Sequence, residues 1–149
     1  MMTAKKDFSY YHPIVVRYGD LDPQGHVNSA VYLTYLESAR LGYYEKAGIW
    51  QRESGMLTGM VVAHIEINYL APIHLGQSLQ VGLSLAHIGN KSITFDFQIE
   101  TEPDCQPLAD GISVMVAYDN QKGKSMPLPP DWREKLTRFE KMDKTDETP

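Results

Sequence analysis

The sequence contains little cysteine, no long apolar run and no excess of positive charge. Cys105 is the only cysteine among 149 residues, so the chain cannot form an internal disulfide. No apolar stretch approaches the length of a membrane span, and the N-terminus lacks the charged-then-apolar pattern of a signal peptide. We therefore expect a cytoplasmic protein without a membrane partner. The net charge of -5 disfavours nucleic acid as a partner, because phosphate binding needs a positive field.

Several common catalytic patterns are also missing. The sequence has no Gly-x-Ser-x-Gly elbow and no Ser-x-x-Lys pair. The five histidines, at positions 12, 26, 64, 74 and 87, do not have the spacing of paired metal ligands, so we predict no metal site. Gly123-Lys124-Ser125 matches the end of a phosphate-binding loop, but Tyr118 stands where that motif needs its first glycine. A nucleotide-binding loop is therefore excluded.

The composition, with 42% hydrophobic and 22% charged residues, is that of a globular protein with one core. We predict a flexible N-terminus at residues 1–10 and a single domain at 11–130. A short charged helix at 131–142 is expected to lie outside that domain, and 143–149 are expected to be disordered.

The first half of the chain predicts one strand, one loop and one long helix. Ile14–Tyr18 has the β-branched content of a strand, and Gly19–His26 has the turn-forming residues of a loop. A helix is predicted from about Asn28 to Ala47, ending before Gly48. Its apolar stripe recurs every four residues, at Val31, Tyr35, Ala39 and Tyr43, flanked by Tyr32 and Leu36. Ala39 and Gly42 are small enough for another element to approach the helix closely. Residues 50–59 are predicted to be loop.

Four later segments alternate apolar and polar residues with a period of two, which indicates strands with one buried face. The residues predicted to face the core are Val61, Ala63, Ile65, Ile67 and Tyr69; Leu79, Val81, Leu83 and Leu85; Ile93, Phe95, Phe97 and Ile99; and Ile112, Val114, Val116 and Tyr118. Turns at Gly89-Asn90 and Pro103–Pro107 favour antiparallel pairing. The expected fold is α+β, with a curved antiparallel sheet of about five strands wrapped around one long helix.

The loop before the predicted helix has features of a reactive site. Pro23 keeps Asp22 extended and outside the helix, and Gly25 allows close approach of a ligand to the backbone. The first helical amides, at 27–29, would lack intrahelical partners and could hold an oxyanion. Spacing alone favours a simpler alternative, in which these polar residues only cap the helix and form a turn. Both alternatives stay open on this reasoning.

The loop and helix resemble the 4-hydroxybenzoyl-CoA thioesterase family of hotdog proteins. The resemblance extends over Val16–Leu33, which includes the run Asp-Pro-Gln-Gly-His-Val-Asn-Ser, and over Tyr35–Arg40. A second, less specific match is Ile67–Gly76. With the order of strands, the similarity covers about Tyr11–Tyr118. It implies a single hotdog domain that forms dimers, often paired into tetramers, with active sites at the subunit interface.

The resemblance also implies an activity, the hydrolysis of acyl-CoA thioesters without a separate cofactor. Asp22 falls on the family's catalytic aspartate, acting as general base or as nucleophile. The oxyanion donors would be the backbone amides of Val27, Asn28 and Ser29, and the site would be lined by Pro23, Gly25 and His26. His26 and Asn28 are also similar to residues of acyl carrier protein thioesterases. In those enzymes an Asn stands where this chain has Gln24, which favours coenzyme A as the carrier.

Other candidates have two interpretations each. Glu37 would touch the acyl group, or, as we favour, pair with Arg40. His64 would line a neighbouring subunit's site, although an ordinary surface histidine is favoured. Asn90, Lys91 and Ser92 would meet the nucleotide of coenzyme A, and a plain surface lysine is equally compatible with the sequence. The helix tyrosines are expected in the core and interface, with an aromatic acyl pocket as the alternative: Tyr32, Tyr35, Tyr43 and Tyr44.

Two further functions remain as alternatives. A hotdog hydratase or dehydratase would use a histidine paired with an acidic residue, and His26 with Glu37 is a candidate pair. The Asp-Pro-x-Gly loop does not fit that class, which therefore ranks lower. A non-catalytic protein that binds acyl thioesters is the other alternative.

Overall fold

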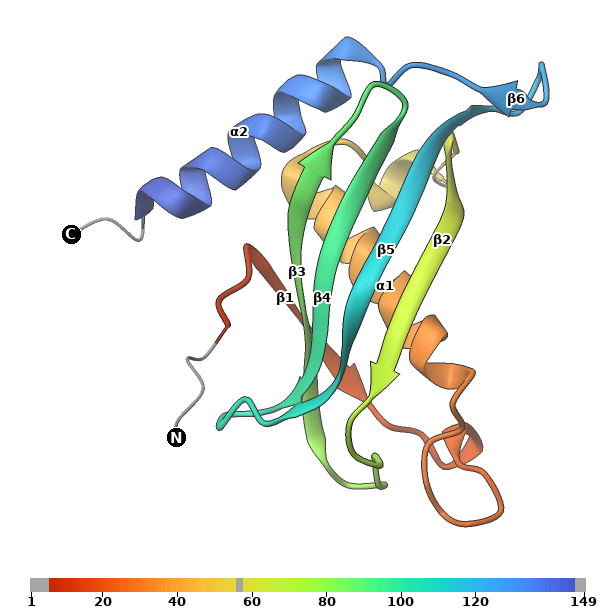
Figure 1. Cartoon of the computed structure of the whole chain (residues 1–149), viewed down its shortest axis with the longest axis vertical. Coiled ribbons are helices and arrows are strands. Elements are labelled where there is room, and N and C mark those ends of the chain that lie inside the picture. Colours follow the sequence, from red (N-terminus) through yellow and green to blue (C-terminus); the bar gives the residue numbers. More distant parts are fainter. Residues whose placement is uncertain (1–5, 56–57, 147–149) are drawn as a thin grey trace.

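The computed structural model describes residues 6–55 and 58–146, and their side chains as far as 141. Figure 1 shows a sheet lying across one long helix, α1. The elements in chain order are β1 (Tyr10–Val15), α1 (Val31–Ala47), β2 (Met60–Tyr69), β3 (Ser78–Ile88), β4 (Ser92–Thr101), β5 (Pro107–Asp119), β6 (Lys124–Ser125) and α2 (Pro130–Asp146), with short 3-10 turns at Tyr18–Asp20 and Arg52–Ser54. The strand order is β1-β3-β4-β5-β2, every pair is antiparallel, and the short β6 pairs with β5. This confirms the predicted α+β arrangement.

The core lies between the sheet and the apolar face of α1. Tyr43 packs edge-to-face on Phe95 of β4, with ring centroids 4.9 Å apart, and Ala39 is fully buried. Gly42 is needed for this packing, because a Cβ there would overlap the Tyr10 hydroxyl and lie 2.8 Å from Nδ1 of His12. At its other end α1 stops at Gly48, in the left-handed conformation with φ of 89°.

The first strand is displaced from its predicted position. It covers Tyr10–Val15 rather than Ile14–Tyr18, and His12 lies opposite Val81 of β3. The chain leaves the sheet after Val15 because Asp20 accepts the Arg17 N–H at 2.9 Å and closes a 3-10 turn. Part of the expected flexible N-terminus is packed as well, since Phe8 is buried against Gly82. Residues 1–5 lie outside the described part of the chain.

The buried faces of β2 and β5 differ from the predicted ones. In β5 the buried residues are Leu108 and Ala109 at its start and Ser113, Met115 and Ala117 farther along, whereas the predicted apolar set is half-buried. In β2 the register shifts between Val62 and His64, so an extra residue sits in the strand. A bulge of one residue reverses which side chains face the core. Val62 therefore lies opposite Met115, although Val61, Val62 and Ala63 are all exposed. After the bulge, Ile65 and Ile67 are half-buried between exposed neighbours, as predicted.

The C-terminal helix is longer and more integrated than predicted. It begins at Pro130 and continues to Asp146, beyond the expected end at 142; residues 147–149 lie outside the described residues. Leu136 is fully buried. The carboxylate of Glu140 accepts hydrogen bonds from the hydroxyls of Ser9, at 2.7 Å, and of Tyr43. The helix thus closes one end of the core and holds the N-terminal segment.

Candidate active site

The segment between β1 and α1 forms a closed turn. An antiparallel bridge joins Leu21 to Val27, and within it the Asp22 N–H donates to the His26 carbonyl at 2.7 Å. Gly25 has φ of 85°, a conformation that glycine adopts without strain. A second bridge joins His26 to His74, whose rings meet edge-to-face at 4.9 Å. The turn is therefore fixed to the chain that follows β2.

The carboxylate of Asp22 is oriented by this turn. Its Oδ1 accepts the backbone N–H groups of Gln24, at 2.9 Å, and of His26, at 3.2 Å. Its Oδ2 has no hydrogen-bond partner in the described part of the chain, and the residue is half-buried. The predicted turn is present, but Asp22 does not cap α1. One oxygen is held in place and the other is available to water or to a substrate.

The structure leaves fewer amides free to bind an oxyanion than the sequence predicted. Helix α1 begins at Val31, not at Asn28, and the N–H groups of Val27 and Asn28 already donate to the carbonyls of Ile73, at 2.9 Å, and Asp20, at 2.8 Å. These two amides are occupied because the turn is bonded to its neighbours on both sides. The Ser29 N–H donates to no atom of the described residues. Of the three predicted donors, Ser29 alone is free, within that part of the chain, to bind an oxyanion.

Two tyrosines lie near this loop: Tyr69, which was predicted only as a core residue of its strand, and Tyr32, for which an acyl pocket was the alternative to a place in the core. The Tyr69 hydroxyl donates to the Ser29 carbonyl at 3.0 Å, and its ring meets that of Tyr32 at 4.9 Å. Burial raises the pKa of Tyr32, as do Tyr69 and the charge of Asp22. The sequence did not predict that Tyr32 lies beside the loop, because Tyr32 also fits the apolar stripe of α1.

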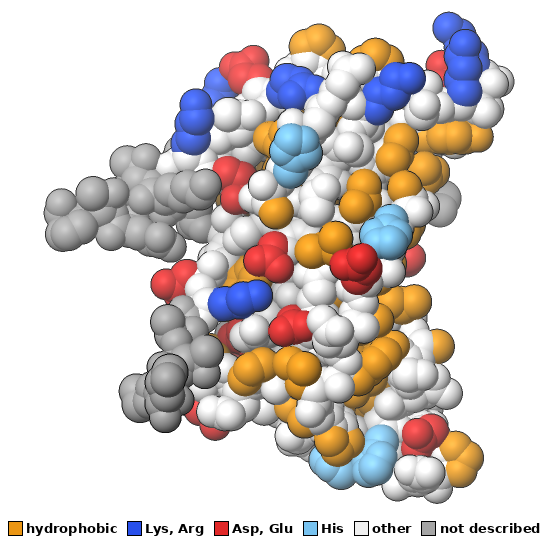
Figure 2. Space-filling view, viewed as in Figure 1, with side chains coloured by type: hydrophobic (Ala, Val, Ile, Leu, Met, Phe, Trp, Pro, Cys, Tyr) orange, Lys and Arg blue, Asp and Glu red, His pale blue; other side chains and the backbone are white. Residues whose placement is uncertain are grey.

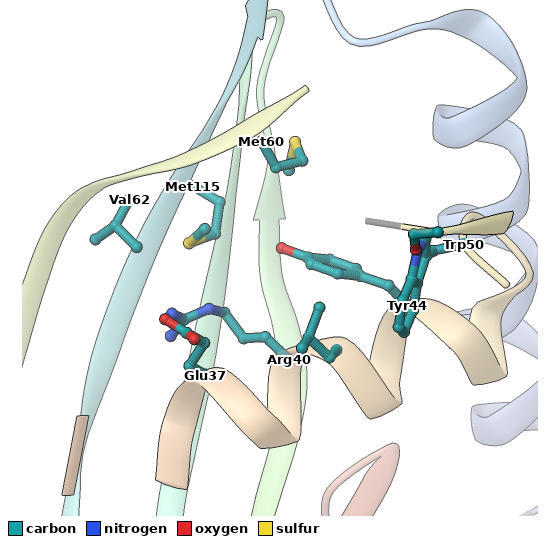
Figure 3. A pocket seen from close by; sticks show the side chains of 9 residues that line it. Glu37, Arg40, Tyr44, Trp50, Met60, Val62 and Met115 are labelled. Atoms are coloured by element: carbon teal, nitrogen blue, oxygen red, sulfur yellow. The ribbon is translucent and has the colours of Figure 1, made fainter. Parts of the chain in front are cut away.

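Farther along α1, Glu37 and Arg40 line a cavity of about 510 Å³ (Figure 3). The favoured ion pair between them is not formed: no N–O distance within 4.0 Å links the two among the described side chains. Burial lowers the pKa of Arg40, and the charges of Tyr44 and then Glu37 only partly oppose this shift. Glu37 therefore lines a pocket, which is the position that the alternative interpretation, a contact with the acyl group, requires.

The remaining candidates do not gather at Asp22 within one chain. His64 is exposed on β2 and lies 3.3 Å from Glu66. The turn carrying Asn90, Lys91 and Ser92 joins β3 to β4 at the opposite end of the molecule from the Asp22 loop (Figure 1). There the Asn90 carbonyl accepts the Leu128 N–H at 3.0 Å, and Lys91 is exposed.

The pairing that a hydratase would need is absent within the described single chain. The ring of His26 contacts His74, and none of the ion pairs in this part of the chain joins His26 to Glu37. No group of three or more His, Cys, Asp or Glu side chains among the described residues could hold a metal ion. No helix in the described ranges is long and apolar enough to cross a membrane.

Comparison with known proteins identifies the fold and the reaction class. Residues 16–136 match the family described as the thioesterase-like superfamily. The chain is 34% identical to the long-chain acyl-CoA thioesterase FadM of Escherichia coli (strain K12), over 86% of this chain and 97% of FadM. It is 27% identical to a 1,4-dihydroxy-2-naphthoyl-CoA hydrolase of Synechococcus elongatus, over 83% of this chain and 93% of that protein.

A solved structure agrees with these relatives. A thioesterase of Thermus thermophilus, solved in complex with coenzyme A and zinc, superposes with a TM-score of 0.79 and 34% identity, covering 91% of this chain and 97% of that one. The chain therefore belongs to the thioesterase-like superfamily of hotdog-fold proteins, whose reaction is the hydrolysis of acyl thioesters.

Proposed function

We propose that this chain hydrolyses acyl-coenzyme A thioesters and that Asp22 is its catalytic carboxylate. The observation that carries the proposal is the environment of this side chain. Two turn amides hold Oδ1, while Oδ2 is free of partners in the described residues. A carboxylate held in one orientation with one oxygen free is suited to act as a general base or as a nucleophile.

The chemistry needs few groups, because the leaving group is good. A thiol has a pKa near ~8.5, so a thiolate departs without prior protonation. Asp22 removes a proton from water as the water oxygen attacks the carbonyl carbon, or attacks that carbon itself to give an anhydride that water then cleaves. The carbonyl oxygen gathers negative charge in either route, and the Ser29 N–H is the donor we assign to it. The carbon–sulfur bond breaks as this charge collapses and the thiolate leaves; in the second route this step forms the anhydride, before water cleaves it.

Coenzyme A is the proposed carrier. FadM and the naphthoyl-CoA hydrolase act on coenzyme A esters by their names, and Gln24 replaces the Asn expected of carrier-protein thioesterases. The Asn90–Ser92 turn lies at the opposite end of the sheet from the Asp22 loop (Figure 1). A contact of Lys91 with the nucleotide therefore requires a second chain, turned end for end.

The edge strand β2 supports such a dimer. It pairs on one side with β5, and large apolar side chains are exposed on it and just beyond it: Val61, Val62, Tyr69 and Leu70. Figure 2 shows hydrophobic side chains along this edge of the molecule. Antiparallel pairing of two β2 strands would cover the edge and place opposite ends of two chains side by side. The pairing of dimers into tetramers and the cytoplasmic location stay predictions.

The test of this function is the Asp22→Asn substitution. Asparagine keeps the acceptor that holds the turn but cannot act as a base, so kcat should fall by at least ~100-fold with an unchanged melting temperature. Hydrolysis is measured with a panel of acyl-CoAs and a thiol-trapping dye, which also separates hydrolysis from hydration or simple binding.

A matched control is available at Asp119. Its Oδ1 also accepts two turn amides, from Gln121 at 2.9 Å and Lys122 at 3.0 Å, in a different loop. Asp119→Asn repeats the same chemical change at another carboxylate oxygen that accepts two turn amides, and it should leave the rate unaltered. Full activity in the Asp22 variant, or an equal loss in both, would remove Asp22 from the mechanism.

A further inference from the structure

The cavity beside α1 has mainly apolar walls. It lies between the helix and the inner faces of β2 and β5, and Figure 3 shows the side chains around it. Its apolar lining is Leu41, Trp50, Met60, Val62 and Met115. Its volume of about 510 Å³ is typical of small-molecule sites, which are mostly apolar with a few placed polar groups. A hydrocarbon chain would fit such walls.

Two polar groups in this cavity are buried without partners in the described chain. Arg40 is 5% exposed and Tyr44 is 2% exposed. Neither Nη1 of Arg40 nor the hydroxyl of Tyr44 has a hydrogen-bond partner among the described residues. In Figure 3 the Tyr44 ring extends from α1 toward Met60 and Met115, whereas the Arg40 side chain extends toward Glu37. An unsatisfied buried donor destabilises a fold considerably, so such a group calls for a partner.

The partner must be a hydrogen-bond acceptor. Arg40 has only donors and stays charged even though burial lowers its pKa. Glu37, which faces the same cavity, is exposed and makes no ion pair with it in the described residues. A ligand oxygen would satisfy the Arg40 Nη1 and receive the Tyr44 hydroxyl as well. The two residues are one turn apart on the helix, where side chains are neighbours, so both donors can serve one ligand group.

We infer that this cavity binds the far end of the acyl group and that Arg40 and Tyr44 recognise an oxygen atom carried there. The inference rests on the proposed acyl-CoA hydrolysis and adds the substrate class, an acyl group with an apolar body and a remote oxygen acceptor. Arg40 lies nine residues after the start of α1, or about 14 Å along the helix from the end that follows the Asp22 loop. The oxygen is therefore well removed from the thioester, and a simple alkyl chain leaves both groups unpaired.

Binding can be measured without hydrolysis. S-alkyl-coenzyme A thioethers have no carbonyl to attack; a series of increasing chain length is made with a terminal methyl and with a terminal hydroxyl group. We expect that at one chain length the hydroxyl form binds at least ~10-fold more tightly by calorimetry, since a hydrogen bond to a charged donor is among the stronger ones. No preference at any length would overturn the inference.

Three variants locate the effect. Arg40→Met and Tyr44→Phe remove the two donors and should abolish the preference for the hydroxyl form, whereas Glu134→Gln, at an exposed ion pair of α2, should keep it. Tyr44→Phe deletes a hydroxyl that bonds to nothing in the described chain, so its folding is not at risk. If Arg40→Met and Tyr44→Phe weaken self-association in sedimentation and leave the preference intact, the two groups serve a subunit contact and the inference fails. A fully active Asp22→Asn enzyme would refute the catalytic proposal alone, because thioether binding does not depend on it.

Discussion

Two aspartates on one loop have opposite surroundings. Asp20 is 1% exposed, and its carboxylate accepts the Arg17 N–H at 2.9 Å, the Arg17 guanidinium at 3.0 Å and the Tyr35 hydroxyl at 2.8 Å. Asp22 is half-buried and keeps one oxygen free in the described chain. A fully bonded carboxylate holds structure and has no capacity left for a substrate. The division of roles thus follows from hydrogen-bond saturation.

The buried carboxylate should make stability depend on pH. Burial alone would raise the pKa of Asp20, but the hydrogen bonds from Arg17 and Tyr35 outweigh it and the pKa is lowered. A lowered pKa in the folded state means that the stabilisation is complete above the unfolded value, near ~3.9, and is lost as the pH falls through the folded value. We expect Asp20→Asn to lower the free energy of unfolding at neutral pH by about 2–4 kcal/mol and to flatten its fall below about pH 4.

Urea unfolding followed by circular dichroism at a series of pH values measures both effects. Asp119→Asn, in an exposed turn, serves as the comparison and should keep the wild-type acid dependence. If the Asp20 variant loses unfolding free energy at low pH as steeply as the wild type does, then other carboxylates cause that loss.

Among the secondary-structure elements, the alternation of apolar and polar residues predicted where the strands lie, but not always which face of each strand is buried. The periodic segments after residue 60 all became strands, because period-two patterning has few other structural solutions. The bulge between Val62 and His64 reverses which side chains of β2 face the core before that point, and no local feature of the sequence predicts it. In β5 both faces are apolar enough to be buried. The choice of Met115 over Val114 as a core residue depends on the register with β4, a long-range property.

The candidate site shows the same limit. The loop and Asp22 were predictable because proline, glycine and aspartate act locally. The oxyanion donors were not predictable. The N–H groups of Val27 and Asn28 donate to the carbonyls of Ile73 and Asp20, which only the tertiary fold brings near. The apolar pattern predicted a helix start at about Asn28, and the actual start at Val31 leaves Ser29 as the free amide in the described chain.

Helix α1 crosses β1 at Gly42, and this crossing gives a prediction for the element. Alanine is a better helix former than glycine by about 1 kcal/mol, but its Cβ would overlap the Tyr10 hydroxyl and crowd His12. We expect Gly42→Ala to lower the free energy of unfolding by about 1–3 kcal/mol, because overpacking forces the helix from the strand. Chemical denaturation of the wild type and the variant measures this difference in unfolding free energy.

A second variant checks the cause. Tyr10→Phe removes the overlapping oxygen, so in a double-mutant cycle the alanine should cost less beside phenylalanine than beside tyrosine. Additive losses would place the strain elsewhere in the helix.

For the whole molecule, the candidate site groups are divided between its two ends. The Asp22 loop lies at one end of the sheet, and the Asn90–Ser92 turn lies at the other (Figure 1). The exposed apolar side chains of β2 run between them. A two-fold axis through β2 would bring each end of one chain beside the other end of its partner. Catalysis by this chain should therefore depend on association.

A lysine on the β2 edge tests that dependence. Ala63 is exposed and has no partner residue in β5, so a side chain there can point to solvent in the single chain without disturbing the core. In an antiparallel β2 pair, two lysines would stand near the axis and repel, and charged edge strands resist pairing. Ala63→Lys should raise the dimer dissociation constant by about 10-fold or more and lower the specific activity on dilution, while Ala63→Ser changes neither. Sedimentation equilibrium and thioesterase assays over the same concentrations decide the matter: a wild-type protein that sediments as a single active chain would contradict the shared site.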